Sequence, residues 1–175
     1  APGHGDSPGR RSDMIEVAES VAAVARACGP LQGVIGHSLG GAASVLAMRD
    51  CGLVTPRLVS IGAFSHCLWF TEAFGRLVGM QPAAVAGMRA LLSQRYSHRI
   101  DWSRLGITEA LRAADRHTRT LLVHDRDDRE VPLAHALALH RARPQAELMV
   151  TRGLGHRRVL RDAAVVMRAA GFVRG

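Results

Sequence analysis

Lysine is absent from this sequence. All 23 basic residues are arginine, and with 15 acidic residues the formal net charge is +8. A nucleic-acid-binding surface gathers its basic side chains into a patch or stripe, often beside stacking aromatic residues. Here the arginines are scattered, and aromatic residues make up only 4% of the chain. We therefore interpret the charge as spread over a solvated surface and predict no nucleic-acid partner.

Long apolar runs and cysteine pairs are also missing. No apolar stretch approaches the roughly 18 residues that a membrane-spanning helix needs, so we predict no membrane span. The three cysteines, Cys28, Cys51 and Cys67, are odd in number and form no C-x-x-C pair. This spacing argues against a disulfide framework and a structural zinc site, and it favours a reducing compartment, the cytoplasm. Nothing in the pattern predicts the oligomeric state.

Four short apolar segments have the length and composition of buried strands. They are residues 31–36, 57–64, 120–125 and 146–151. Helical patterns separate them, at residues 14–28, 42–49, 134–141 and 162–172. Alternation of strands with helices predicts an α/β fold with a mostly parallel sheet flanked by helices. With 175 residues, 47% of them hydrophobic, we expect residues 1–175 to form one domain with a real core.

Residues 65–118 interrupt this alternation. The segment contains both tryptophans, the only tyrosine and several amphipathic helical patterns, and it contains no convincing strand. We interpret it as a helical cap inserted over the ends of the strands. Its apolar side chains are candidate pocket walls, although we favour ordinary packing within the cap as the explanation for each of them.

The stretch GHSLG, residues 36–40, stands between a predicted strand and a predicted helix. A strand that reverses into a helix within so few residues needs strained backbone at the serine, and glycines two positions before and after it relieve collisions. The reversal would project the Ser38 hydroxyl beyond the sheet as a nucleophile. The N–H group of Leu39 would then face a developing oxyanion. A plain glycine-rich turn is the alternative.

A serine hydroxyl needs a base, and the sequence has nine histidines. We favour His156, because its loop follows the fourth predicted strand and opens at the same sheet edge as Ser38. His124, at the end of the third strand, is the main alternative. Four further histidines are interpreted as solvated: His98, His117, His135 and His140.

An acid must orient the histidine, and the loop after the third predicted strand offers Asp125, Asp127 and Asp128. Asp125 lies nearest the strand and would point back into it, whereas Asp128 has room to reach an imidazole. We therefore predict Asp128 as the acid and keep Asp127 as an alternative. The order Ser38, Asp128, His156 is the nucleophile–acid–base order of an α/β-hydrolase sheet.

With these residues in place, the sequence resembles the α/β-hydrolase superfamily over nearly its whole length. APGHGDSPG (1–9) resembles the D-x-P-G-H-G-x-S loop, and GHSLGG (36–41) matches the nucleophile turn. HDRDDREVP (124–132) resembles the acid loop H-G-x-x-D-x-x-V-P, and GLGHRR (153–158) resembles the base loop. Residues 65–118 correspond to the variable cap.

The resemblance implies a serine hydrolase that cleaves a small, apolar carboxylic ester or thioester through an acyl-enzyme, without metal or organic cofactor. Asp128 falls on the family's acid, while Asp125 stands where glycine is usual. The family's early strands, and the loop with the second oxyanion donor, have no counterpart in these residues. We therefore expect that the domain is incomplete at its N-terminus and that residues 31–36 form an exposed edge. A non-catalytic binding module of the same fold is the alternative function.

Overall fold

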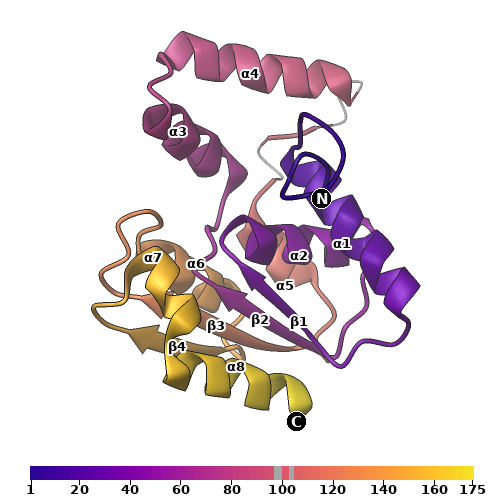
Figure 1. Ribbon diagram of the computed structural model, residues 1–175, viewed down its shortest axis with the longest axis vertical. Coiled ribbons are helices and arrows are strands. Elements are labelled where there is room, and N and C mark those ends of the chain that lie inside the picture. Colours follow the sequence, from indigo (N-terminus) through magenta and orange to yellow (C-terminus); the bar gives the residue numbers. More distant parts are fainter. Residues whose placement is uncertain (97–99, 103–104) are drawn as a thin grey trace.

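The computed structural model describes residues 1–96, 100–102 and 105–175, and its core is a four-stranded sheet with helices on both faces (Figure 1). In chain order the elements are α1 (Met14–Cys28), β1 (Val34–His37), α2 (Leu39–Asp50), β2 (Arg57–Ile61), α3 (Cys67–Leu77), α4 (Pro82–Arg95), α5 (Ile107–Ala113), β3 (Arg119–Asp125), α6 (Ala134–Ala142), β4 (Glu147–Thr151), α7 (Gly155–Arg158), the 3₁₀ turn η1 (Val159–Arg161) and α8 (Ala163–Arg174).

The sheet has the strand order β1-β2-β3-β4, and all neighbouring strands are parallel. This confirms the fold class predicted from the alternation of strands and helices. Because the strands are parallel, their carboxyl ends meet at one edge of the sheet. Ser38 follows β1 at that edge, Gly62 follows β2, and Asp125 and Thr151 are the last residues of β3 and β4.

Each face of the sheet has its own apolar core. One face packs against α1, α2, α5 and α6, and its buried residues include Ala43, Leu58 and Leu122. The other face packs against α8, where Val59 and Leu121 surround Phe172. Successive residues of β2 and β3 therefore point into different cores, which explains why these strands are apolar at almost every position.

Local signals set the ends of several elements. The Asp13 carboxylate accepts hydrogen bonds from the N–H groups of Ile15 and Glu16, both at 3.0 Å, and so caps the start of α1. The second strand was expected over 57–64 but ends at Ile61. The reason is Gly62, whose φ of +59° turns the chain out of the sheet.

Helices α3 and α4 stand apart from the sheet in Figure 1, whereas α5 packs on α2 and α6 within the main body. We refer to residues 67–95 as the α3–α4 segment. The chain enters and leaves this part of the fold side by side, since the N–H of Ile107 donates to the carbonyl of Ser65 at 2.9 Å. This hydrogen bond joins the two connections at the start and the end of the segment and helps to hold the segment over the ends of the strands.

Arg143 is buried, with only 2% of its surface exposed, and it ties the end of α5 to the body. Its guanidinium donates to the carbonyls of Leu111, Ala114, Asp115 and Thr118 at 2.7–3.2 Å. Two carbonyls at the end of α5 and two in the connection to β3 thereby find a donor inside the protein. Arg143 thus fixes the connection between α5 and β3.

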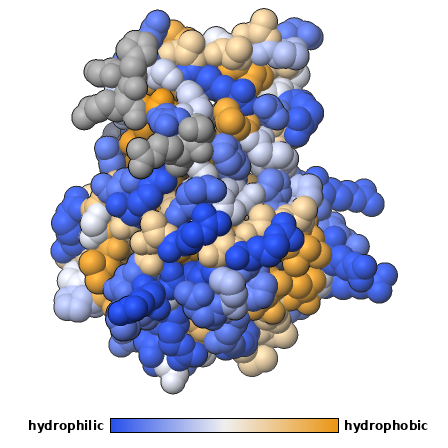
Figure 2. Space-filling view, turned by 180° about the vertical axis from the view of Figure 1, so that it is seen from behind, coloured by the Kyte–Doolittle hydropathy of each residue, from blue (hydrophilic) through white to orange (hydrophobic). Residues whose placement is uncertain are grey.

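The strand β1 forms one edge of the sheet: among the described residues it pairs with β2 alone, and Ile35 on it is 51% exposed. Figure 2 shows the face opposite to that of Figure 1, where hydrophilic residues predominate and apolar residues form separate patches. Within the described ranges, every helix is too short or too polar to cross a bilayer.

Candidate active site

Ser38 links β1 to α2 and has an unusual backbone conformation. With φ +52° and ψ −118°, it is the only residue other than glycine with a positive φ in the described part of the chain. Its N–H donates to the carbonyl of Ile61 at 2.8 Å, and its own carbonyl accepts from Ala42 at 3.1 Å. These bonds from strand and helix hold the serine in a conformation that costs free energy. Such strain at a serine is typical of functional sites.

The glycines around Ser38 differ in their steric roles. A Cβ atom on Gly36 would lie 2.7 Å from backbone atoms of Gly40 and Gly41, and one on Gly41 would lie 2.8 Å from the Ser60 hydroxyl. A Cβ on Gly40 would meet nothing within 4 Å. The expectation that both flanking glycines relieve collisions is therefore wrong for Gly40, and Gly41 is the second crowded position. It faces the neighbouring strand β2, which the local sequence does not reveal.

This difference predicts opposite effects of two alanine substitutions. Gly36→Ala should lower the free energy of unfolding by about 2 kcal/mol, because rigid backbone must move to admit the methyl group. Gly40→Ala should leave it unchanged or raise it by at most about 1 kcal/mol, because Gly40 lies in α2 and alanine favours helix. Urea unfolding of both variants measures the difference, and equal destabilisation would contradict the steric argument.

Asp128 and His156 lie in direct contact. The carboxylate oxygen Oδ2 of Asp128 is 2.7 Å from Nδ1 of His156, and both residues are buried. The other oxygen, Oδ1, accepts from the N–H groups of Glu130 and Val131, both at 2.8 Å. Burial raises the pKa of Asp128, but the hydrogen bonds from His156 and Val131 outweigh it, so the pKa lies below its usual range. Asp128 is therefore ionised at neutral pH and fixes the Nδ1–H tautomer of His156.

Two neighbours hold the His156 ring and its backbone in position. Nε2 of His37 is 2.9 Å from the carbonyl of His156, and the two ring centroids are 4.6 Å apart. Burial lowers the pKa of His37, so this ring is neutral at neutral pH and donates its Nε2–H. On another side, a Cβ on Gly62 would lie 3.3 Å from the His156 ring, so a larger residue there would press on the imidazole, and the φ of +59° also favours glycine.

Ser38 and His156 line the same cleft, of about 670 Å³, which we call the catalytic cleft. Its apolar walls include Phe64, Trp69, Phe70, Phe74, Leu77 and Val131. Among the described residues, no hydrogen bond joins the Ser38 hydroxyl to His156. The structure thus brings the predicted acid and base into contact and sets the predicted nucleophile on the wall of the same cleft.

The other two aspartates of the acid loop bind the base loop instead. Asp125 is 1% exposed and accepts from the N–H groups of Asp127, Leu154 and Gly155 and from the Thr151 hydroxyl at 2.8–3.1 Å. Asp127 is exposed and accepts from the N–H of Gly153 at 3.0 Å. Sequence reasoning missed this role of Asp125. The signal was a carboxylate at a strand end, in a position where the superfamily usually has glycine.

The alternative base and the other histidines take different places. His124 is buried, does not line the catalytic cleft, and has its Nε2 2.7 Å from the carbonyl of Val131. His135 is half-buried and accepts from the N–H of Ser65, so its interpretation as a solvated residue is wrong. His98 lies outside the described residues.

Leu39 is the first residue of the twelve-residue helix α2. Its N–H therefore has no acceptor within the helix and lies at the positive end of the helix dipole. This N–H, one residue after the Ser38 hydroxyl, can stabilise negative charge that develops on an attacked carbonyl oxygen. In the described part of the chain, no group of three or more His, Cys, Asp or Glu side chains is arranged so that it could hold a metal ion.

Comparison with known proteins gives one family match and many structural similarities. The family model described as TAP-like protein matches residues 90–174. A search of the curated proteins finds no match.

Three solved structures illustrate the structural similarity. A monoacylglycerol lipase of Paleococcus ferrophilus is 18% identical with a TM-score of 0.64, over 99% of this chain and 81% of the lipase. An alpha/beta fold family hydrolase of Bacillus anthracis is 14% identical with a TM-score of 0.62, over 98% and 78% of the two chains. Est816, described as an N-acyl homoserine lactone degrading enzyme, is 21% identical with a TM-score of 0.66, over 97% and 79%. At these identities the similarity concerns the fold.

Proposed function

The chain has the α/β-hydrolase fold, and we propose that it is a serine hydrolase that cleaves esters or thioesters of apolar carboxylic acids. The observation that carries the proposal is the 2.7 Å contact between Asp128 and His156 beside a cleft that Ser38 also lines. The strained backbone at Ser38 gives independent support, because such a conformation persists only where the surroundings enforce it.

In the proposed reaction His156 takes the proton of the Ser38 hydroxyl on Nε2 while the serine oxygen attacks the carbonyl carbon of the ester. The N–H of Leu39 donates to the resulting oxyanion, and Asp128 stabilises the imidazolium without taking its proton. As the tetrahedral intermediate collapses, His156 gives the proton to the departing alcohol or thiol. A water molecule then repeats the sequence on the acyl-enzyme and releases the acid and the serine.

The walls of the catalytic cleft support an apolar substrate. Phe64, Trp69 and Phe70 come from the β2 end and the start of α3, and Val131 faces them from the acid loop. The rings of Phe64 and Phe70 stack with their centroids 4.6 Å apart. Apolar side chains around the reacting bond exclude water and strengthen the electrostatic interactions of the transition state. Structural neighbours named as a lipase and an esterase support ester bonds as the substrate class.

A fluorophosphonate probe tests the nucleophile directly. We expect the wild-type chain to gain the mass of one phosphonyl group per molecule, and Ser38→Ala to gain none, because the activated serine alone attacks the phosphorus. Ser20→Ala is the matched control: this serine donates to the carbonyl of Glu16 on α1, and its loss should leave labelling unchanged. Intact-protein mass spectrometry measures the result. A wild-type chain that stays unlabelled would favour the non-catalytic binding module.

A further inference from the structure

A second cavity of about 260 Å³ lies between the start of α1 and the α3–α4 segment, and we call it the inner chamber. Most of its wall is apolar: Met14, Ile15, Val17, Leu39, Cys67, Phe70, Phe74, Met88, Leu92, Ile100, Trp102 and Leu105. It does not include Ser38, Asp128 or His156. The reaction proposed above therefore leaves this cavity without a role.

The inner chamber adjoins the catalytic cleft. Phe70 and Phe74, one helical turn apart on α3, line both cavities. Leu39, which follows Ser38 in the chain, lines the chamber as well. The two cavities thus share two phenylalanine side chains, and the chamber wall includes the residue that follows the proposed nucleophile.

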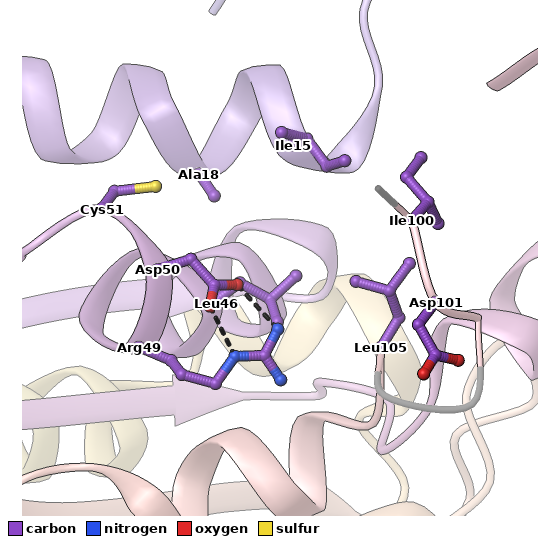
Figure 3. A pocket seen from close by; sticks show the side chains of 9 residues that line it. All are labelled: Ile15, Ala18, Leu46, Arg49, Asp50, Cys51, Ile100, Asp101 and Leu105. Carbon is purple, nitrogen blue, oxygen red and sulfur yellow. Dashed lines mark hydrogen bonds and ion pairs between the residues drawn. The ribbon is translucent and has the colours of Figure 1, made fainter. Parts of the chain in front are cut away.

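The far end of the inner chamber is marked by a change to charged side chains. Ile15, Ile100 and Leu105 also line an outer pocket of about 430 Å³ (Figure 3). In that view the three apolar side chains stand at one end, while Arg49 and Asp50 form an ion pair at 2.7 Å further along. The apolar path from Ser38 therefore ends near Ile100 and Leu105.

Most polar groups in the chamber wall have hydrogen-bond partners, but the buried hydroxyl of Ser12 has none among the described residues. The Tyr96 hydroxyl donates to the carboxylate of Asp13, at 2.8–2.9 Å from its two oxygens, and Thr71 accepts from Arg89 at 2.8 Å. Burial raises the pKa of the Cys67 thiol to about 12, so it is uncharged at neutral pH. An occupant of this chamber therefore meets mostly hydrocarbon surface, with the Ser12 hydroxyl and His4 as further polar groups in the wall.

We propose that the inner chamber is the acyl-chain subsite of this hydrolase, with Phe70 and Phe74 as the gate through which the chain passes. This inference rests on the proposed function, since it places the carbonyl at Ser38 and the hydrocarbon tail behind the gate. An engineered apolar cavity of about 150 Å³ holds benzene, with its six carbon atoms. In the same proportion, a chamber of about 260 Å³ holds about ten carbon atoms, which indicates a medium-chain acyl group.

Burial of the tail has a measurable consequence for substrate preference. Each methylene group removed from water contributes roughly 0.8 kcal/mol, which is about fourfold in kcat/KM when the burial is retained in the transition state. We therefore expect kcat/KM for p-nitrophenyl esters to rise from acetyl through butyryl and hexanoyl to about decanoyl. It should level off or fall at tetradecanoyl, when the chamber is full.

Leu92 and Leu91 on α4 give a matched pair for the test. Leu92 lines the chamber, whereas its neighbour Leu91 is 67% exposed and lines none of the cavities described above. Leu92→Trp should lower the decanoyl-to-acetyl ratio of kcat/KM at least tenfold, and Leu91→Trp should leave it unchanged. Met88→Trp, one turn earlier in the wall, is the second variant should Leu92→Trp fail to fold. An unchanged ratio in the folded chamber variant overturns the proposal.

A binding measurement separates this proposal from the proposed function. In a Ser38→Ala background, which cannot form the acyl-enzyme, a dansyl-labelled undecanoic acid should bind with a fluorescence increase. Adding Leu92→Trp should weaken its binding at least tenfold, while adding Leu91→Trp should not. If Leu92→Trp weakens binding as expected but the wild-type chain hydrolyses no ester, the proposed function is refuted and the proposed acyl-chain subsite stands. If the wild-type chain hydrolyses esters but both tryptophan variants bind the fatty acid equally well, the acyl-chain subsite is refuted and the proposed function stands.

Discussion

Replacing Asp128 by asparagine is expected to lower kcat about 10⁴-fold on p-nitrophenyl butyrate, the loss typical of a triad whose acid becomes an amide. Oδ2 of Asp128 lies 2.7 Å from Nδ1 of His156 and holds the proton on that nitrogen. An amide nitrogen in this place offers a donor instead of an acceptor, so the imidazole changes its tautomer and no longer accepts the serine proton. Steady-state kinetics measures the effect.

The fold should survive this substitution, because asparagine keeps an acceptor at Oδ1. That atom receives the N–H groups of Glu130 and Val131, and it shapes the acid loop. Thermal unfolding of Asp128→Asn should therefore resemble that of the wild type much more closely than its activity does.

Asp127→Asn is the control that decides between the two candidate acids. Asp127 is exposed, and among the described residues its one hydrogen bond to the base loop comes from the N–H of Gly153. Its loss should change kcat by no more than about twofold, the range of ordinary surface substitutions. If Asp127→Asn abolished activity while Asp128→Asn retained it, the assignment of the acid would be reversed.

Much of the fold follows from patterns that operate within one segment. Alternating strands and helices predict the parallel sheet, and Asp13 predicts the start of α1, because the cap and its N–H partners lie within three residues. The parallel sheet in turn explains why segments after β1, β3 and β4 lie at one edge. That is why Ser38, Asp128 and His156 could be proposed together from sequence, although their catalytic roles stay predictions.

What the sequence could not predict depends on contacts between distant segments. Gly41 is crowded by Ser60 on the next strand, and a local motif contains no information about that neighbour. The four carbonyl partners of Arg143 lie 25 or more residues away along the chain. The inner chamber requires α4 to reach α1, where Tyr96 bonds Asp13 across 83 residues. Such packing arises only in the folded chain.

Asp125 is the clearest case of a residue whose importance lies in such a contact. It accepts four hydrogen bonds. Two of the donors, Leu154 and Gly155, lie immediately before His156, and a third, Thr151, is the last residue of β4. Burial raises its pKa, but the bonds from Gly155, Thr151 and Leu154 outweigh burial and lower the pKa below its usual range. The carboxylate therefore joins the acid loop to the base loop and positions His156 without touching a substrate.

Asp125→Asn is expected to lower the free energy of unfolding by about 3 kcal/mol. Both oxygens of the buried carboxylate accept hydrogen bonds, and the amide replaces one oxygen by an NH₂ group, which leaves the donors on that side without an acceptor. Activity should fall as well, through displacement of His156. The pH dependence has a definite sign. A carboxyl whose pKa is lowered by folding stabilises the protein above its ordinary pKa of about 3.9, and the stabilisation is lost as pH falls through the lower folded pKa.

Urea unfolding from neutral pH down to the acid range measures both effects. The free energy of unfolding of the wild type should fall steadily below about pH 4. That of Asp125→Asn should be lower at neutral pH and fall less steeply, because only the contribution of Asp128 is then lost with acid. Asp127→Asn is again the control, because it also removes a carboxylate that contacts the base loop, but an exposed one. If Asp125→Asn unfolded at the same urea concentration as Asp127→Asn and with the same pH profile, Asp125 would not hold the base loop. Asp128 and His37, which also form hydrogen bonds with His156, would then be the residues that hold it in place.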